Sequence, residues 1–124
     1  MIYCFDLDDT ICFPNHEAKD TFEKYGKALP CLEIIEYIRH IKTVSVGNTI
    51  LIYTARRMVT HNGDIKKIKE DVQEITENWL KEYDVPYDSL IFGKPYADVY
   101  IDDKALNVEE LKGRIPRSKD TYVK

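Results

Sequence analysis

Apolar and polar residues alternate along the chain in blocks that predict strands separated by helices. Short runs of consecutive apolar or β-branched residues, typical of buried strands, occupy residues 2–7, 49–53, 90–92 and 99–101. Segments with an apolar stripe at helical spacing predict helices over residues 31–46 and 65–83, and Asn107 can cap a short helix over residues 108–112. This order predicts an α/β fold, a Rossmann-like parallel sheet with helices on both faces.

The segments between these elements are polar and carry turn residues. Residues 13–30 have a weak pattern broken by Gly26 and Pro30, which predicts a loop with at most one helical turn. Residues 54–64 form a polar loop, and the tail over residues 113–124 is polar and expected to be loose. A length of 124 residues suits a single domain.

Polar and charged residues follow each predicted strand. In parallel sheets, ligands bind outside the carboxyl ends of the strands, so residues that follow different strands face one crevice. The residues that this rule brings together are Asp6, Asp8 and Thr10 after the first strand, Thr54 and Arg56 after the second, Lys94 after the third, and Asp102 and Asp103 after the fourth.

A buried cluster of acids needs cations, because unpaired buried charges are costly. Lys94 supplies one positive charge, and Mg²⁺, which prefers oxygen ligands, would supply two more. A carboxylate beside such cations can attack phosphorus and form an acyl phosphate, while a second carboxylate transfers protons. These residues therefore predict a site for phosphoryl chemistry, with different roles for Asp6 and Asp8.

The ordered motifs resemble the haloacid dehalogenase superfamily of phosphohydrolases. They are "DLDDT" at residues 6–10, Thr54 after "LIY", Lys94 in "GKP", and "DD" at residues 102–103. The resemblance implies that Asp6 is the nucleophile and a metal ligand, and that Asp8 is the general acid and base whose backbone carbonyl binds the metal. It also implies that Thr54 and Lys94 hold the phosphoryl group.

The same resemblance implies that Asp102, Asp103 or both complete a Mg²⁺ site. Asp103 has alternatives of its own, since it could cap the turn after the strand or pair with Lys104 or Arg56. Thr10 is expected to bind substrate, and its hydroxyl is expected to brace the loop that aims the two acids. Asp9 receives no catalytic role.

A closer likeness is to small superfamily members without a cap domain that are associated with capsule or polysaccharide biosynthesis. The supporting stretches are "TARRM", "HNGDIKKI", "WLKEYDVPYDSLIFGKP" and "YIDDKAL". In those relatives Asn is expected where Arg57 stands. The likeness implies a sugar phosphate or a related metabolite as the substrate.

The chain leaves no room for a cap domain between the motifs. Only 43 residues separate Thr10 from Thr54, and 39 separate Thr54 from Lys94, and both gaps already hold predicted elements. The expected lid is the segment 13–30. An open site of this kind suits a bulky substrate, or closure by a second subunit in a homo-oligomer.

Two arginines follow the second predicted strand, and two roles are possible for them. Arg56 and Arg57 could clamp a substrate anion through bidentate hydrogen bonds, or they could lie in a solvated loop. The sequence favours neither reading over the other.

Composition narrows the class of partner. The net charge of −4 argues against a general nucleic-acid binder, and no apolar stretch is long enough to span a membrane. Three cysteines without metal-site spacing favour a reduced, cytoplasmic setting. The leading prediction is a Mg²⁺-dependent phosphomonoesterase. The alternatives are a nucleic-acid end phosphatase, a nucleotide phosphatase, and a phosphate-binding regulatory protein without turnover.

Overall fold

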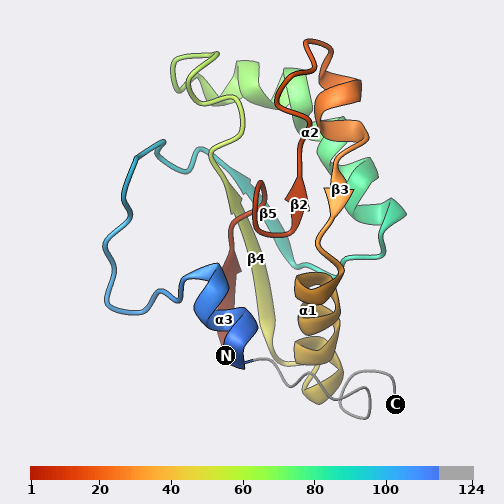
Figure 1. The fold of residues 1–124 in the computed structure, drawn as a ribbon, viewed down its shortest axis with the longest axis vertical. Helices are drawn as coiled ribbons and strands as arrows, with labels where there is room; N and C mark the ends of the chain where they lie inside the picture. The colour runs from red at the N-terminus through yellow and green to blue at the C-terminus, as the bar shows by residue number, and fades with distance from the viewer. Residues whose placement is uncertain (115–124) are drawn as a thin grey trace.

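A three-stranded parallel sheet organises the fold. The computed structural model describes residues 1–114. Strands β1 (Ile2–Phe5), β4 (Thr49–Thr54) and β5 (Ser89–Phe92) pair in the order β1-β4-β5, all in parallel. Their carboxyl ends therefore share one edge of the sheet (Figure 1). The α/β class and the parallel sheet expected from the sequence are confirmed.

Helices connect the strands at almost the predicted positions. Helix α1 (Leu32–Val44) joins β1 to β4, and α2 (Ile65–Glu82) joins β4 to β5. The Asp64 carboxylate caps α2, because its Oδ1 accepts a hydrogen bond from the Lys67 N–H at 3.3 Å. Helix α3 (Val108–Arg114) has the expected Asn107 cap, whose Oδ1 accepts from the Glu109 N–H at 2.9 Å.

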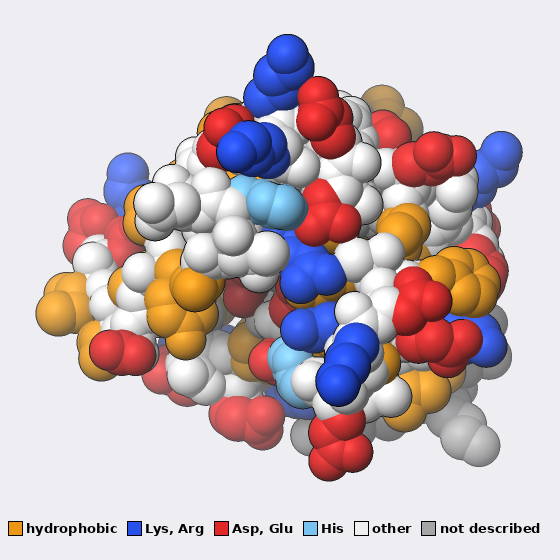
Figure 2. All heavy atoms as spheres, turned by 90° about the horizontal axis from the view of Figure 1, so that it is seen from above, with side chains coloured by type: hydrophobic (Ala, Val, Ile, Leu, Met, Phe, Trp, Pro, Cys, Tyr) orange, Lys and Arg blue, Asp and Glu red, His pale blue; other side chains and the backbone are white. Residues whose placement is uncertain are grey.

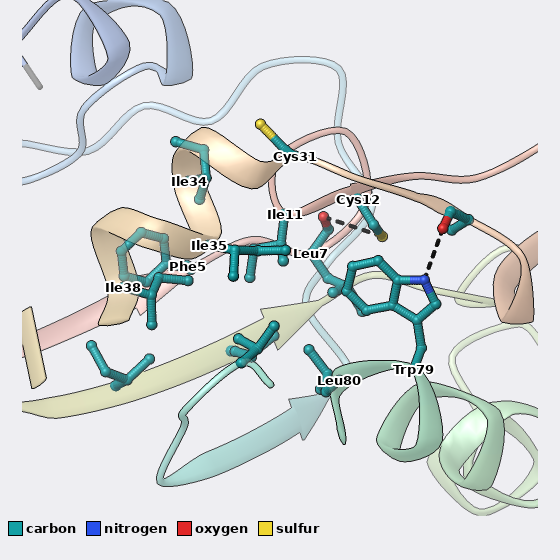
Figure 3. Packing of buried hydrophobic residues seen from close by; sticks show 14 of the residues in the cluster. Phe5, Leu7, Ile11, Cys12, Cys31, Ile34, Ile35, Ile38, Trp79 and Leu80 are labelled. Atoms are coloured by element: carbon teal, nitrogen blue, oxygen red, sulfur yellow. Dashed lines mark hydrogen bonds between the residues drawn. The ribbon is translucent and has the colours of Figure 1, made fainter. Parts of the chain in front are cut away.

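The two faces of the sheet are covered unequally. Ile50 and Ile52 of β4 are fully buried in one cluster with side chains of α1 and α2 (Figure 3), whereas Ile2 on the opposite face is 72% exposed. Both connections step in the same direction along the sheet, and right-handed crossovers then place both helices on one side. Burial along β4 therefore alternates between full and partial, although the strand is apolar throughout.

Residues 13–30 are more ordered than the sequence predicts. Strand β2 (Cys12–Phe13) pairs with β3 (Leu29–Pro30) in a small antiparallel sheet, and a π-helix, η1 (Phe22–Gly26), lies between them. Tyr25 of η1 is buried against Ile68 and Val72 of α2. The indole N–H of Trp79 donates to the Ala28 carbonyl at 2.8 Å (Figure 3). The segment predicted as a lid is thus anchored to α2.

The fourth predicted strand is wrong. Residues 93–107 have no strand in the structure, and Figure 1 shows them as a long connection that runs outside the sheet to α3. Ile101 is 94% exposed. The Tyr100 hydroxyl donates to the Pro95 carbonyl at 2.5 Å and accepts from the Ala97 N–H at 3.1 Å. These local contacts curl the segment into a turn, and a run of three apolar residues is too short to outweigh them.

Two further expectations concern the membrane and the tail. Among residues 1–114, no helix combines the length and the apolar character needed to cross a bilayer. The predicted loose tail begins at Gly113, but Gly113 and Arg114 belong to α3, and the rest of the tail lies outside the described residues.

The bond between Trp79 and Ala28 gives a test of how residues 13–30 are held. Trp79→Phe should lower the free energy of unfolding by about 1–3 kcal/mol, because the buried Ala28 carbonyl loses its donor. Urea unfolding followed by circular dichroism measures the change. Asn78→Ala, at the adjacent exposed position of α2, should stay within about 0.5 kcal/mol of the wild type. Equal stability of Trp79→Phe and the wild type would contradict the anchoring role.

Candidate active site

The loop after β1 is held by backbone hydrogen bonds to one carbonyl. The Leu7 carbonyl accepts from the N–H groups of Thr10, Ile11 and Cys12 at 2.8–3.2 Å. Asp9 lies in the left-handed region with φ of 63°, which Asp and Asn tolerate better than most residues. Asp9 therefore serves the turn, and its side chain points outward, 66% exposed and 3.6 Å from His16 Nε2.

Asp6 and Lys94 form an ion pair where β1 and β5 end. Lys94 Nζ lies 3.6 Å from Asp6 Oδ1, and the Lys94 N–H donates to the Thr54 carbonyl at 3.1 Å. Gly93 has φ of 103°, and a side chain there would meet Ile65 Cδ1 at 2.7 Å, so this turn requires glycine. Burial raises the pKa of Asp6, while the charge of Lys94 and the Leu7 N–H partly offset that rise.

Asp8 is held by a buried arginine. Arg56 Nη2 donates to Asp8 Oδ1 at 2.5 Å, and Nε donates to Oδ2 at 3.1 Å, so both carboxylate oxygens are engaged. The Arg56 side chain is 2% exposed, its Nη1 donates to Thr76 Oγ1 at 2.7 Å, and its guanidinium lies 4.1 Å from the Tyr25 ring centroid. Arg56 is therefore fully used inside the protein, which excludes the predicted clamp on a substrate anion in this arrangement.

The two predicted threonines line the same pocket and are buried. Thr54 is 1% exposed at the end of β4, and its Oγ1 accepts from the Arg56 N–H at 3.0 Å. That bond leaves the hydroxyl proton of Thr54 available for a ligand. Thr10 is 8% exposed and also lies in the pocket wall.

Arg57 has a different environment from Arg56. Its Nε lies 3.1 Å from Asp71 Oδ2, in a direction that makes no hydrogen bond, and that buried nitrogen has no hydrogen-bond partner among the described residues. His61 Nε2 lies 2.8 Å from the same oxygen. The Arg57 guanidinium is 5.3 Å from the Tyr25 ring centroid, and Arg57 lines the pocket. The bidentate clamp remains a prediction for Arg57 alone.

These side chains surround a pocket of about 500 Å³ at the carboxyl edge of the sheet. Figure 2 looks onto this end of the molecule and shows Lys, Arg and His side chains gathered beside a hollow. Lys94 reaches the site through its pair with Asp6 and is not in the pocket wall itself. The residues that line the pocket and were proposed from the sequence are Asp6, Asp8, Thr10, Thr54, Arg56 and Arg57.

Asp102 and Asp103 do not join this group. Both are exposed and neither lines the pocket, because the segment that carries them does not form the predicted strand. The Lys104 N–H donates to Asp102 Oδ1 at 2.8 Å and lowers the pKa of Asp102. Among residues 1–114, no three His, Cys, Asp or Glu side chains lie where they could share a metal ion. The predicted Mg²⁺ ligand set is therefore not assembled in this arrangement.

Several pocket residues were not predicted as site residues. Lys24 and Tyr25 come from η1, and Tyr96 and Tyr100 come from the connection after β5. No sequence pattern marked Lys24 or Tyr25, since a five-residue π-helix has no periodicity to detect. The tyrosines after β5 could have been suspected from their position beside Lys94.

The chain is similar to a protein of known structure and to a protein with a functional name. No family model matches it. A protein of Vibrio cholerae with a crystal structure is 31% identical, with a TM-score of 0.77, over 98% of this chain and 94% of that one. The two proteins belong to one family. This relationship establishes the fold, and the chemistry rests on other observations.

A second relative has a functional name. Over 62 residues the chain is 37% identical to a Chlorobaculum tepidum protein named "Putative 5'(3')-deoxyribonucleotidase". The matched part is 47% of this chain and spans about a third of the relative's length, 31%. A nucleotidase is a phosphatase-type hydrolase, so the match supports the phosphatase class, and it does not support the likeness to capsule biosynthesis.

The Arg56–Asp8 pair gives a test of the site's architecture. Arg56→Met should lower the free energy of unfolding by about 3 kcal/mol, because it leaves the Asp8 carboxylate without its partner. The double variant Asp8→Asn with Arg56→Met should recover part of that loss, since no uncompensated charge remains. Lys66→Met, on the exposed face of α2, is the matched control and should change little. Additive losses in the double variant would contradict the coupling.

The raised pKa of Asp6 gives a pH-dependent test. Because the folded-state pKa lies above the usual 3.8, ionised Asp6 lowers stability at neutral pH, and this cost disappears below both values. Asp6→Asn should therefore resist urea slightly better than the wild type at pH 7 and equally at pH 3. Asp88→Asn should instead unfold at a lower urea concentration than the wild type at pH 7. The Ile50 N–H and Lys42 lower the pKa of Asp88, so its ionised form stabilises the folded state. A destabilised Asp6→Asn at pH 7 would refute the assignment.

Proposed function

We propose that the protein is a phosphatase that hydrolyses phosphate monoesters of small metabolites. The observation that carries the proposal is the carboxylate of Asp6, paired with Lys94 beside the Thr54 hydroxyl in an accessible pocket. The resemblance of half the chain to a protein named as a nucleotidase supports the same chemistry.

The proposed reaction uses Asp6 as the nucleophile. An Asp6 carboxylate oxygen bonds to phosphorus while the bond from phosphorus to the ester oxygen breaks, which leaves an acyl phosphate and an alcohol. Asp8 delivers the proton to the departing alkoxide. Asp8 then takes a proton from the water that hydrolyses the acyl phosphate, so Asp6 is restored and inorganic phosphate leaves. Lys94 and Thr54 offer positive charge and a hydrogen bond to the phosphoryl oxygens.

The contacts of Asp8 bear on its part in this scheme. A carboxylate that accepts hydrogen bonds on both oxygens from Arg56 is arranged as an acceptor. That state suits the second half-reaction, in which Asp8 takes a proton from water. Before the first half-reaction, one oxygen of Asp8 has to exchange its bond from Arg56 for a proton.

Magnesium dependence is part of the proposal on the strength of the sequence motifs. Mg²⁺ prefers oxygen ligands, and the Asp6 carboxylate and the substrate phosphate would offer such oxygens in one pocket, which favours a divalent cation. The arrangement described above does not bring a third carboxylate to Asp6 and Asp8, so no step of the scheme is assigned to the metal.

A nucleotide is the first candidate substrate. The name of the Chlorobaculum relative points to nucleotides, and exposed Tyr96 and Tyr100 line the pocket, where aromatic rings can stack on a base. A sugar phosphate of polysaccharide biosynthesis is the second candidate, on the likeness of the sequence motifs. The free thiols of Cys4, Cys12 and Cys31 favour a cytoplasmic location.

A substrate panel tests the proposal. The wild type with Mg²⁺ should hydrolyse p-nitrophenyl phosphate and members of a set of nucleoside monophosphates and sugar phosphates, and a chelator should abolish turnover. Asp6→Asn should lower kcat by at least about a thousandfold, because the nucleophile is lost. Phosphate release measures both.

Asp9→Asn is the matched control from the same loop, since Asn also tolerates the left-handed backbone, and most of the activity should remain. Full activity of Asp6→Asn would refute the mechanism. A folded wild type that releases no phosphate from any monoester would instead favour a protein that binds phosphate without turnover. Preferred cleavage of a 3′-phosphorylated oligonucleotide would favour a nucleic-acid end phosphatase.

A further inference from the structure

Each carboxylate in the pocket wall has a basic partner, but one of the cations there, Lys24, has no acidic partner among the described residues. Asp6 faces Lys94 at 3.6 Å, Asp8 faces Arg56 at 2.5 Å, and Asp9 faces His16 at 3.6 Å, so each pocket carboxylate has its own basic partner. Arg57 has Asp71, which lies outside the pocket wall. Among residues 1–114, no carboxylate is within 4.0 Å of Lys24 Nζ, as an ion pair requires. Lys24 therefore brings a positive charge to the pocket that no acid of the described chain balances.

Lys24 and Arg57 lie around the same aromatic ring. Lys24 Nζ is 5.4 Å from the Tyr25 ring centroid, and Arg57 Cζ is 5.3 Å from it. Tyr25 is 6% exposed and packed against α2, so the ring is a fixed support for both cations. Lys24 and Arg57 both border the pocket near this ring, and positive groups that border one pocket form a favourable place for an anion.

Arg57 is positioned without being fully used. Its Nε lies 3.1 Å from Asp71 Oδ2 and makes no directed hydrogen bond there. The two terminal nitrogens of the guanidinium can still donate to an oxyanion in the fork geometry that suits phosphate. The backbone at Arg57 is left-handed, with φ of 63°, a conformation uncommon outside glycine that tends to persist where a site depends on it.

We propose that Lys24 and Arg57 form a second anion subsite in the pocket. The preferred substrates would then carry a second phosphate group in addition to the one that is hydrolysed. This inference rests on the proposed function, and it narrows the substrate class to bisphosphorylated metabolites such as nucleoside 3′,5′-bisphosphates.

The hydrolytic test compares substrates that differ by one phosphate. The wild type should have a kcat/KM for adenosine 3′,5′-bisphosphate about tenfold above that for adenosine 5′-monophosphate, as expected for one added ion pair in a partly buried site. Lys24→Gln should bring this ratio close to one while turnover of the monophosphate persists. Raising the ionic strength should also reduce the ratio, because salt screens the attraction.

Lys27→Gln is the matched control. Lys27 follows η1, lies 5.6 Å over the Phe22 ring and is exposed, but it pairs with Glu23 and does not line the pocket. The substrate ratio of this variant should equal that of the wild type. Equal kcat/KM values for the two substrates in the wild type, or a preference that Lys24→Gln retains, would overturn the inference.

A binding measurement separates this inference from the proposed function. Asp6→Asn keeps Lys24 and Arg57, so calorimetry on it should show adenosine 3′,5′-bisphosphate bound about tenfold more tightly than the monophosphate. Adding Lys24→Gln should remove the difference. This preference would stand even if the wild type hydrolysed no monoester, which would refute only the reaction. Equal affinities in Asp6→Asn would refute the subsite and leave the reaction untouched.

Discussion

The bidentate ion pair between Arg56 and Asp8 joins three parts of the chain that are distant in sequence. Asp8 belongs to the loop after β1, Arg56 to the turn after β4, and Thr76, which receives a further bond from Arg56, to the middle of α2. Tyr25 of η1 covers the guanidinium from another side. A buried charge is tolerated only when it is paired and its donors are satisfied, and here the partners of Arg56 come from the loop after β1, from α2 and from η1.

The same requirement explains how a small sheet edge can carry three neighbouring carboxylates. Each has a separate partner, since Asp6 faces Lys94, Asp8 faces Arg56, and Asp9 faces His16 at the surface. The three environments also differ in burial. Burial raises the pKa of Asp6, whereas Asp9 is exposed and its left-handed backbone forms the turn. Different environments are what chemically equivalent side chains need in order to take different roles.

The segment between β2 and β3 contributes more to the pocket than a mobile cover would. It is tied to α2 through Trp79 and through Tyr25, and it delivers Lys24 to the pocket wall. Selectivity in the proposed enzyme would therefore come from a fixed wall, built on the same contacts that stabilise the fold. The open pocket admits substrates that extend beyond the reacting phosphate.

The sequence by itself determined the three strands of the parallel sheet, the helices between them and the edge at which the chemistry gathers. Apolar periodicity located α1 and α2 to within two residues, and residues after β1, β4 and β5 meet because parallel strands end on one side. Tertiary structure alone decided the partners. Arg56 turned inward to Asp8, and residues 99–101 followed local contacts of Tyr100, which left Asp102 and Asp103 outside the pocket. Local spacing specifies which face or strand end a residue occupies, whereas the pairing of charges depends on distances between segments that only packing sets.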